Sequence, residues 1–215
     1  MDKQADHQYA LYGRRVQADL QAYAKQLRST TEQQYGAAVA REIEQFLAVL
    51  LEQNLLPGIL VLTGYTLAGG QDQAMATRAA RAVAMFHAVV SMQQGPAGLQ
   101  NAARAGEHAA QILLANLEVD AEANRRAVSI MNRTLLLTAH AQAEQRHNPG
   151  SPQILEWQAL ERAVNPLHVG MVLAGADCHA TDAITPLATE LGKAIVQNGE
   201  NIEKLLEKIL NQPLS

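Results

Sequence analysis

The stretch that decides the fold runs from Asn165 to Glu203 and reads NPLHVGMVLAGADCHATDAITPLATELGKAIVQNGENIE. It contains two apolar segments with helical spacing, separated by a short polar joint, and its apolar pattern breaks at Asn-Gly-Glu-Asn, residues 198–201. The stretch therefore predicts two packed helices that end in a polar break, where we look first for a function. Small residues that would let another helix approach closely are Gly170, Ala174, Gly175 and Gly192.

The rest of the chain also shows helical periodicity in its apolar residues. Hydrophobic residues make up 48% of the sequence and aromatic residues only 4%, a composition that favours helices over sheets. No segment shows the sustained alternation of apolar and polar residues that is typical of a strand. We therefore predict an all-α protein. Besides the opening stretch, the expected helices cover 33–53, 59–67, 72–92, 99–117, 121–144, 154–164 and 202–210.

Residues 1–32 carry a weaker helical pattern, with many glutamines and charges between the apolar positions. A helix lying on the body and an arm reaching to a partner are both compatible with this pattern. No long or flexible linker divides the remaining chain. We expect an N-terminal helix or arm over 1–32 and a single helical domain over 33–215.

Charge and hydropathy exclude several classes of partner. The net charge is -4 and no run of Lys or Arg is longer than a pair, so a nucleic-acid surface is not expected. The apolar stretch 55–67 is too short and too interrupted to span a membrane, and the N-terminus lacks the apolar core of a secretory signal. The single cysteine, Cys178, cannot form an internal disulfide and is expected to be half-buried. These features predict a cytoplasmic protein without a transmembrane segment.

Two pairs of residues have spacings that could bind a metal. Glu200 and Glu203 lie one helical turn apart and could hold one Mg²⁺ weakly, or form a solvated helix end. Glu144 and His147 make one E-x-x-H pair, but di-iron sites need two such pairs and two further glutamates. A metal site is therefore expected at most at Glu200 and Glu203.

For the other polar residues, a structural role is the simpler interpretation. His87 lies in an apolar segment and is either a functional residue or a hydrogen-bonded core histidine. At the joint of the opening stretch, we expect Thr181 or Asp182 to cap the helix that follows.

Three segments together resemble the trans-isoprenyl diphosphate synthase (polyprenyl synthetase) family. Residues 56–62, Leu-Pro-Gly-Ile-Leu-Val-Leu, followed by Leu-Ala-Gly-Gly at 67–70, are similar to its "RP-x-L-x-L" helix and the small residues that close it. Residues 82–92 are similar to the helix whose histidine, here His87, leads into the first Asp-rich motif. Residues 165–196 are similar to its "L…AGA…LG-x-A-F-Q" segment, with Ile-Val in place of Phe-Gln. The resemblance implies an isoprenoid synthase fold, shortened at the C-terminus.

The groups that carry the chemistry of that family are mostly replaced. Its two DDxxD motifs hold Mg²⁺ ions that neutralise an allylic diphosphate. The first motif would fall at Gln94, Gly95 and Gly98, none of which is acidic. The second would fall at 199–203, where glutamates, Glu200 and Glu203, fill two of three acidic positions. Mg²⁺ is expected only if activity remains, and no other cofactor is expected.

The positive charges that bind diphosphate in the family are also missing. The basic cluster before the proline corresponds to residues 53–56, Gln-Asn-Leu-Leu, and the family's Lys-Thr to Trp157-Gln158. An uncompensated buried charge costs several kcal/mol or more. The resemblance and its losses therefore predict a chain that does not catalyse prenyl transfer alone.

Three functions remain open on these grounds. The first is a non-catalytic partner or regulatory subunit of an active prenyl diphosphate synthase, as a homodimer or as a heteromer. The second is a helical protein that binds an isoprenoid or another lipid in the family's apolar tunnel without catalysis. The third is a residual Mg²⁺-dependent prenyltransferase that uses Glu200 and Glu203.

Overall fold

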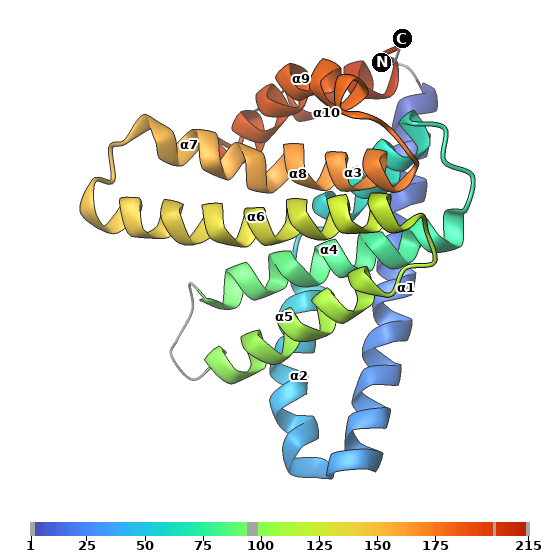
Figure 1. The fold of residues 1–215 in the computed structure, drawn as a ribbon. Helices are drawn as coiled ribbons and strands as arrows, with labels where there is room; N and C mark the ends of the chain where they lie inside the picture. The colour runs from blue at the N-terminus through green and yellow to red at the C-terminus, as the bar shows by residue number, and fades with distance from the viewer. Residues whose placement is uncertain (1–2, 94–98, 200, 214–215) are drawn as a thin grey trace.

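The computed structural model describes residues 3–93, 99–199 and 201–213, which form helices and turns and no strand. This confirms the all-α prediction. The helices are α1 (Lys3–Tyr35), α2 (Ala37–Glu52), α3 (Leu56–Leu67), α4 (Gln73–Gln93), α5 (Gln100–Ala115), α6 (Ala121–His147), α7 (Pro152–Ala159), the π-helical segment η2 (Leu160–Val164), α8 (Asn165–Leu173), α9 (Cys178–Val196) and α10 (Ile202–Leu210) (Figure 1).

Helices α3 and α4 form the centre of the bundle. Every residue of α3 from Leu56 to Tyr65 is buried, as its unbroken apolar run predicts, and Pro57 lies in its first turn. α3 packs on α8 and α4, α4 on α5, α6 on α8, and α9 on α7 and α10. No single described helix is long and apolar enough to cross a membrane, although α2 and α3, bent by 64°, have that length and composition together.

Glycine lets the backbones of α3 and α8 touch. A Cβ atom on Gly170 would lie 2.0 Å from the carbonyl oxygen of Val61, and one on Gly64 would lie 2.1 Å from that of Leu167. A Cβ on Gly192 would likewise lie 2.4 Å from a carbonyl oxygen of α7. The predicted close packing is confirmed at Gly170 and Gly192. Gly175 was wrongly grouped with them, because its φ of +93° serves the turn after α8 and no atom lies within 4 Å of the place a Cβ would take.

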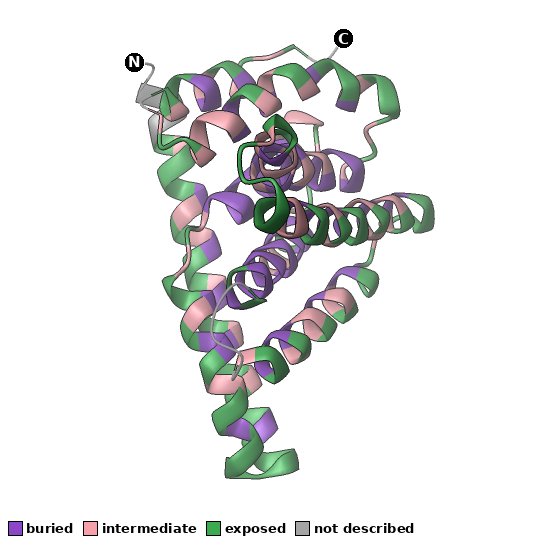
Figure 2. Cartoon of the chain, turned by 90° about the vertical axis from the view of Figure 1, so that its left-hand side faces the viewer, coloured by how far each residue is buried: buried purple, intermediate pink, exposed green. Residues whose placement is uncertain are grey.

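Helix α1 runs along one side of the bundle and buries Tyr12, Val16 and Leu20 in the same apolar cluster as α3 and α4. Its second half pairs with α2 in a hairpin that extends below the body (Figure 1). Exposed residues cover the tip of this hairpin (Figure 2), where Tyr35 is 68% exposed. The division into an arm over 1–32 and a domain over 33–215 stays a prediction.

The opening stretch folds as two helices, α8 and α9, and its polar break follows α9, where Asn198 has a φ of +51°. The predicted cap of α9 was wrong. The carboxylate of Asp177 accepts a hydrogen bond from the backbone N–H of Ala180 at 2.9 Å, so the helix begins at Cys178. Thr181 instead donates its hydroxyl to the carbonyl oxygen of Cys178 at 2.9 Å.

Candidate functional site

The three segments that carry the resemblance meet around one small cavity of about 170 Å³. One wall is the turn into α3, the second is the C-terminal half of α4, and α9 and η2 complete it. The fold thus brings together positions that are far apart in the sequence. The lining residues are Gln53, Asn54, Leu56, Pro57, His87, Ser91, Arg162 and Ile195.

A buried histidine and a buried glutamate form the polar centre of this region. The side chains of His87 and Glu161 are 4% and 5% exposed, and Nδ1 of His87 lies 3.4 Å from Oε1 of Glu161. Glu161 belongs to the π-helical segment η2, in which the N–H of Asn165 bonds to the carbonyl oxygen of Leu160, five residues earlier. π-Helical turns are rare and frequently occur at functional sites. Within this one, Glu161 is buried while the next residue, Arg162, reaches solvent.

Both ring nitrogens of His87 and Oε1 of Glu161 are buried without a hydrogen-bond partner among the described residues. Nε of Arg162 lies 3.5 Å from the same Oε1 of Glu161. Burial raises the pKa of Glu161, but the adjacent His87, with a further contribution from Arg162, outweighs burial and lowers that pKa overall. Glu161 is therefore ionised at neutral pH, and its carboxylate is the counter-ion of Arg162 and the close neighbour of His87. His87 is therefore a core histidine that lies beside a buried carboxylate.

A second cavity, of about 410 Å³, is lined in part by Glu161 and lies between α4, α6 and α7. Its lining is polar: four glutamine amides, a threonine hydroxyl and the two charged side chains of Arg146 and Glu161. Such a lining suits hydrogen bonding to a polar group. The lining residues are Gln93, Thr138, Ala141, Gln142, Gln145, Arg146, Gln158 and Glu161.

The predicted metal site is only partly described. Glu203 lies in the first turn of α10 and is exposed. Burial raises the pKa of Tyr9 in α1, and the nearby charge of Glu203 raises it further. Glu200 lies outside the described residues, as do Gln94, Gly95 and Gly98, so the Mg²⁺ site stays a prediction. Over residues 3–93, 99–199 and 201–213, no three His, Cys, Asp or Glu side chains group closely enough to hold a metal.

The other candidate residues lie at the surface. Glu144 accepts a hydrogen bond from the side chain of Asn148 at 3.2 Å, and His147 is exposed at the end of α6. Cys178 is exposed as well, contrary to expectation, because it begins α9 next to a turn. Its Sγ lies 3.9 Å from Nη2 of Arg126.

Sequence reasoning missed Glu161 and Arg162. One signal was present: Glu161 lies seven residues after Ile154 and three before Val164, on the apolar face of its segment. Both of those apolar residues are buried. A charged residue on such a face predicts either a partner in the core or a functional role.

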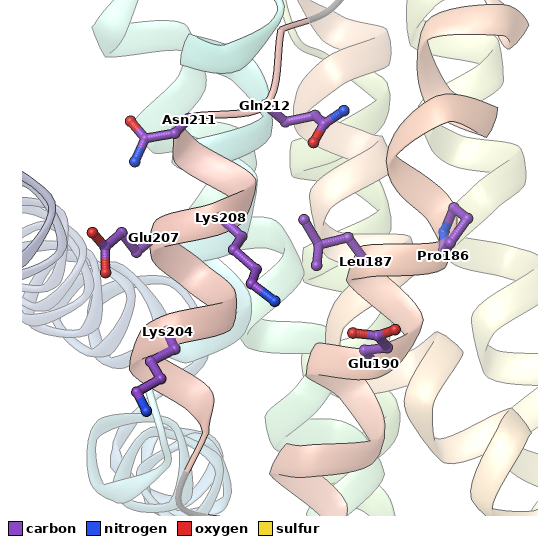
Figure 3. Close-up of a pocket in the computed structure, with 8 residues that line it drawn as sticks. All are labelled: Pro186, Leu187, Glu190, Lys204, Glu207, Lys208, Asn211 and Gln212. Carbon is purple, nitrogen blue, oxygen red and sulfur yellow. The ribbon is translucent and has the colours of Figure 1, made fainter.

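A larger groove of about 770 Å³ lies between α9 and α10 (Figure 3). Lys208 of α10 and Leu187 and Glu190 of α9 face one another across it (Figure 3). It shares no residue with either cavity beside Glu161, and its lysines and glutamates alternate in sign at the surface. This groove therefore does not concentrate charge for a ligand.

No protein-family model matches the chain, and no curated protein sequence matches it. Solved structures do. A putative geranylgeranyl pyrophosphate synthase from Corynebacterium glutamicum matches with a TM-score of 0.72 and 17% identity, over 89% of this chain and 62% of that one. The geranylgeranyl pyrophosphate synthase of that organism, complexed with isoprenyl diphosphate and magnesium, matches with a TM-score of 0.70 and 16% identity. That match covers 86% of this chain and 66% of the synthase. A mint deletion mutant of heterotetrameric geranyl pyrophosphate synthase matches with a TM-score of 0.64 and 17% identity, over 92% of this chain and 88% of the mint chain.

The chain thus spans about two thirds of the length of the Corynebacterium chains. At these identities the likeness concerns the fold. It agrees with the resemblance of the three segments that meet around the smaller cavity. The protein therefore has the all-α isoprenoid synthase fold, which it shares with geranylgeranyl and geranyl pyrophosphate synthases.

Proposed function

We propose that this protein is a non-catalytic partner or regulatory subunit of an active prenyl diphosphate synthase. The observation that carries the proposal is the cavity where the three segments meet. Its volume of about 170 Å³ is below the roughly 300–1,000 Å³ of typical ligand pockets. A prenyl diphosphate would need more room than this cavity offers.

Charge argues in the same direction. Diphosphate can leave a prenyl group only if its developing negative charge is stabilised, by metal ions above all. The one arginine in the described lining, Arg162, is already paired with the ionised Glu161. A diphosphate placed there would meet a buried carboxylate, and an uncompensated buried charge costs several kcal/mol. The polar lining of the second cavity likewise gives little support to the isoprenoid-binding alternative.

The heteromeric assembly of a protein with the same fold supports the partner role. The mint enzyme that shares this fold is described as heterotetrameric. In the present chain, Ile112 of α5 and Leu136 of α6 are 61% and 58% exposed, which is high for large aliphatic side chains. Leu136 belongs to a shallow groove of about 530 Å³ along the outer face of α6. We name this surface the α6 stripe: Arg125, Val128, Ser129, Asn132, Arg133 and Leu136.

The proposal is tested by mixing the purified protein with an active prenyl diphosphate synthase from the same organism. We expect the two to co-elute from a sizing column and the product chain lengths or turnover of the synthase to change. Leu136→Asp, which places a charge on the α6 stripe, should reduce both effects. Elution of the protein by itself, with the synthase unaffected, would contradict the proposal.

A further inference from the structure

Two buried polar atoms without a hydrogen-bond partner belong to side chains that line the second cavity. One is the acceptor Oε1 of Glu161, on a side chain that is 5% exposed, and the other is the donor Nε2 of Gln142. Of the seven such atoms in the described part of the chain, four belong to His87, Gln142 and Glu161. Native proteins leave few buried polar atoms unbonded, and an ionised carboxylate is among the most costly. The cavity therefore calls for a bound partner with both a donor and an acceptor.

The two charged groups of this cavity lie at its opposite ends. Helices α6 and α8 run antiparallel (Figure 1), and the amide of Asn165 donates to the hydroxyl of Thr134 at 2.8 Å. One turn further along each chain segment, Glu161 lies level with Thr138, and both are buried. Arg146 lies two turns beyond Thr138, or about 12 Å along α6, and is exposed. The cavity thus runs from a buried carboxylate to an exposed guanidinium.

The groups along the cavity specify the atoms of a bound molecule. Glu161 is ionised, and Arg162, although close, does not donate to its Oε1, so an amino group would supply the missing donors. None of the ion pairs among the described residues involves Arg146, whose guanidinium suits a carboxylate. Gln142 lies midway between these ends on α6, and its unbonded Nε2 would donate to the same carboxylate.

We propose that the second cavity binds a small zwitterion, a molecule of the amino-acid type whose amino group faces Glu161 and whose carboxylate faces Gln142 and Arg146. The inference goes beyond the partner role and does not depend on it. The volume of about 410 Å³ lies within the roughly 300–1,000 Å³ of typical ligand pockets. An apolar prenyl chain would instead bury the unbonded carboxylate and amide without giving them partners.

Isothermal titration calorimetry tests binding with the purified wild-type chain and three zwitterions of increasing length, glycine, γ-aminobutyrate and ε-aminocaproate. For each, the amine and the carboxylic acid of the same chain length keep only one of the two charged groups. We expect at least one zwitterion to bind with a Kd of about 1 mM or below, and its two half-molecules to bind about tenfold more weakly. No binding by any zwitterion up to about 10 mM would mean that the cavity holds water alone, and would overturn the inference. Equally tight binding of a half-molecule would also overturn it.

Variants at the two ends locate the bound zwitterion. Glu161→Gln keeps the side-chain volume and should weaken binding about tenfold or more, whereas Arg146→Gln, at the exposed end, should weaken it about threefold. Arg104→Gln is the matched control, because Arg104 is exposed on α5 and does not line the cavity. Circular dichroism shows which variants are folded, and Arg146→Gln keeps the test open if Glu161→Gln is not. Wild-type affinity in either folded variant would overturn the inference.

Discussion

Replacing Glu161 by glutamine removes the buried charge that pairs with His87 and Arg162 while it keeps the volume of the side chain. In the wild-type protein, Oε1 of Glu161 lies 3.4 Å from Nδ1 of His87 and 3.5 Å from Nε of Arg162. Unit charges about 4 Å apart attract by about 4 kcal/mol at an effective dielectric constant of about 20. Removing one partner of a buried ion pair typically costs about 3–5 kcal/mol.

Two effects reduce this cost. The side chain of Arg162 is 38% exposed, so water screens its share of the attraction. Glutamine also avoids the desolvation penalty of a buried carboxylate. We therefore expect Glu161→Gln to lower the free energy of unfolding by about 2–3 kcal/mol at neutral pH, at or below the lower end of that range.

Denaturant unfolding of the two proteins measures the difference. Glu156→Gln is the control, since Glu156 is 53% exposed and pairs with Lys193 at the surface. It should cost less than about 1 kcal/mol. The folded-state pKa of Glu161 is lowered from its ordinary value of 4.5, so its stabilising effect is present above pH 4.5 and disappears as pH falls through the lowered pKa. The difference between wild type and Glu161→Gln should therefore shrink in acid.

Equal stability of the two proteins at neutral pH would refute the reasoning. A difference that persists unchanged at acid pH would also refute it, because the loss would then reflect packing and not the carboxylate charge.

Three further predictions test the fold and the proposed lack of catalysis. Gly170→Ala should destabilise the protein by more than about 3 kcal/mol, because its Cβ would lie 2.0 Å from the carbonyl oxygen of Val61. Gly150→Ala, which has open space around it, should be nearly neutral, and thermal unfolding of the two variants measures the difference. Asp177→Ala removes the cap of α9 and should cost about 1 kcal/mol in denaturant unfolding, whereas Asp182→Ala should cost little, and equal effects would contradict the capping assignment. Incubation of the purified chain with prenyl diphosphates and Mg²⁺ should give no product by chromatography, and steady turnover would revive the residual-enzyme alternative.

Most of the helices were predictable because apolar periodicity depends on local sequence. The run from Leu56 to Tyr65 is apolar on every side, and a helix of this kind has to lie in the interior. The cap of α9 was not predictable in the same way. Asp177, Thr181 and Asp182 are all good capping residues, and the choice among them depends on the backbone of the turn, in which Asp177 is extended.

The candidate site was only partly predictable. The resemblance singles out His87 and the turn into α3 separately, and the structure shows both around one cavity. Glu161 was missed because a glutamate in a helical segment usually lies in solvent. Its burial depends on a partner, His87, that another part of the chain supplies. Contacts of this kind arise from tertiary packing, which the local pattern does not encode.

The partner role is tested most directly by the products of an active prenyl diphosphate synthase from the same organism, assayed alone and with increasing amounts of this protein. The account predicts a saturable change in product chain length or turnover with wild type, and little change with Leu136→Asp. Product lengths and turnover that stay constant at every ratio, while the protein is folded, would contradict it.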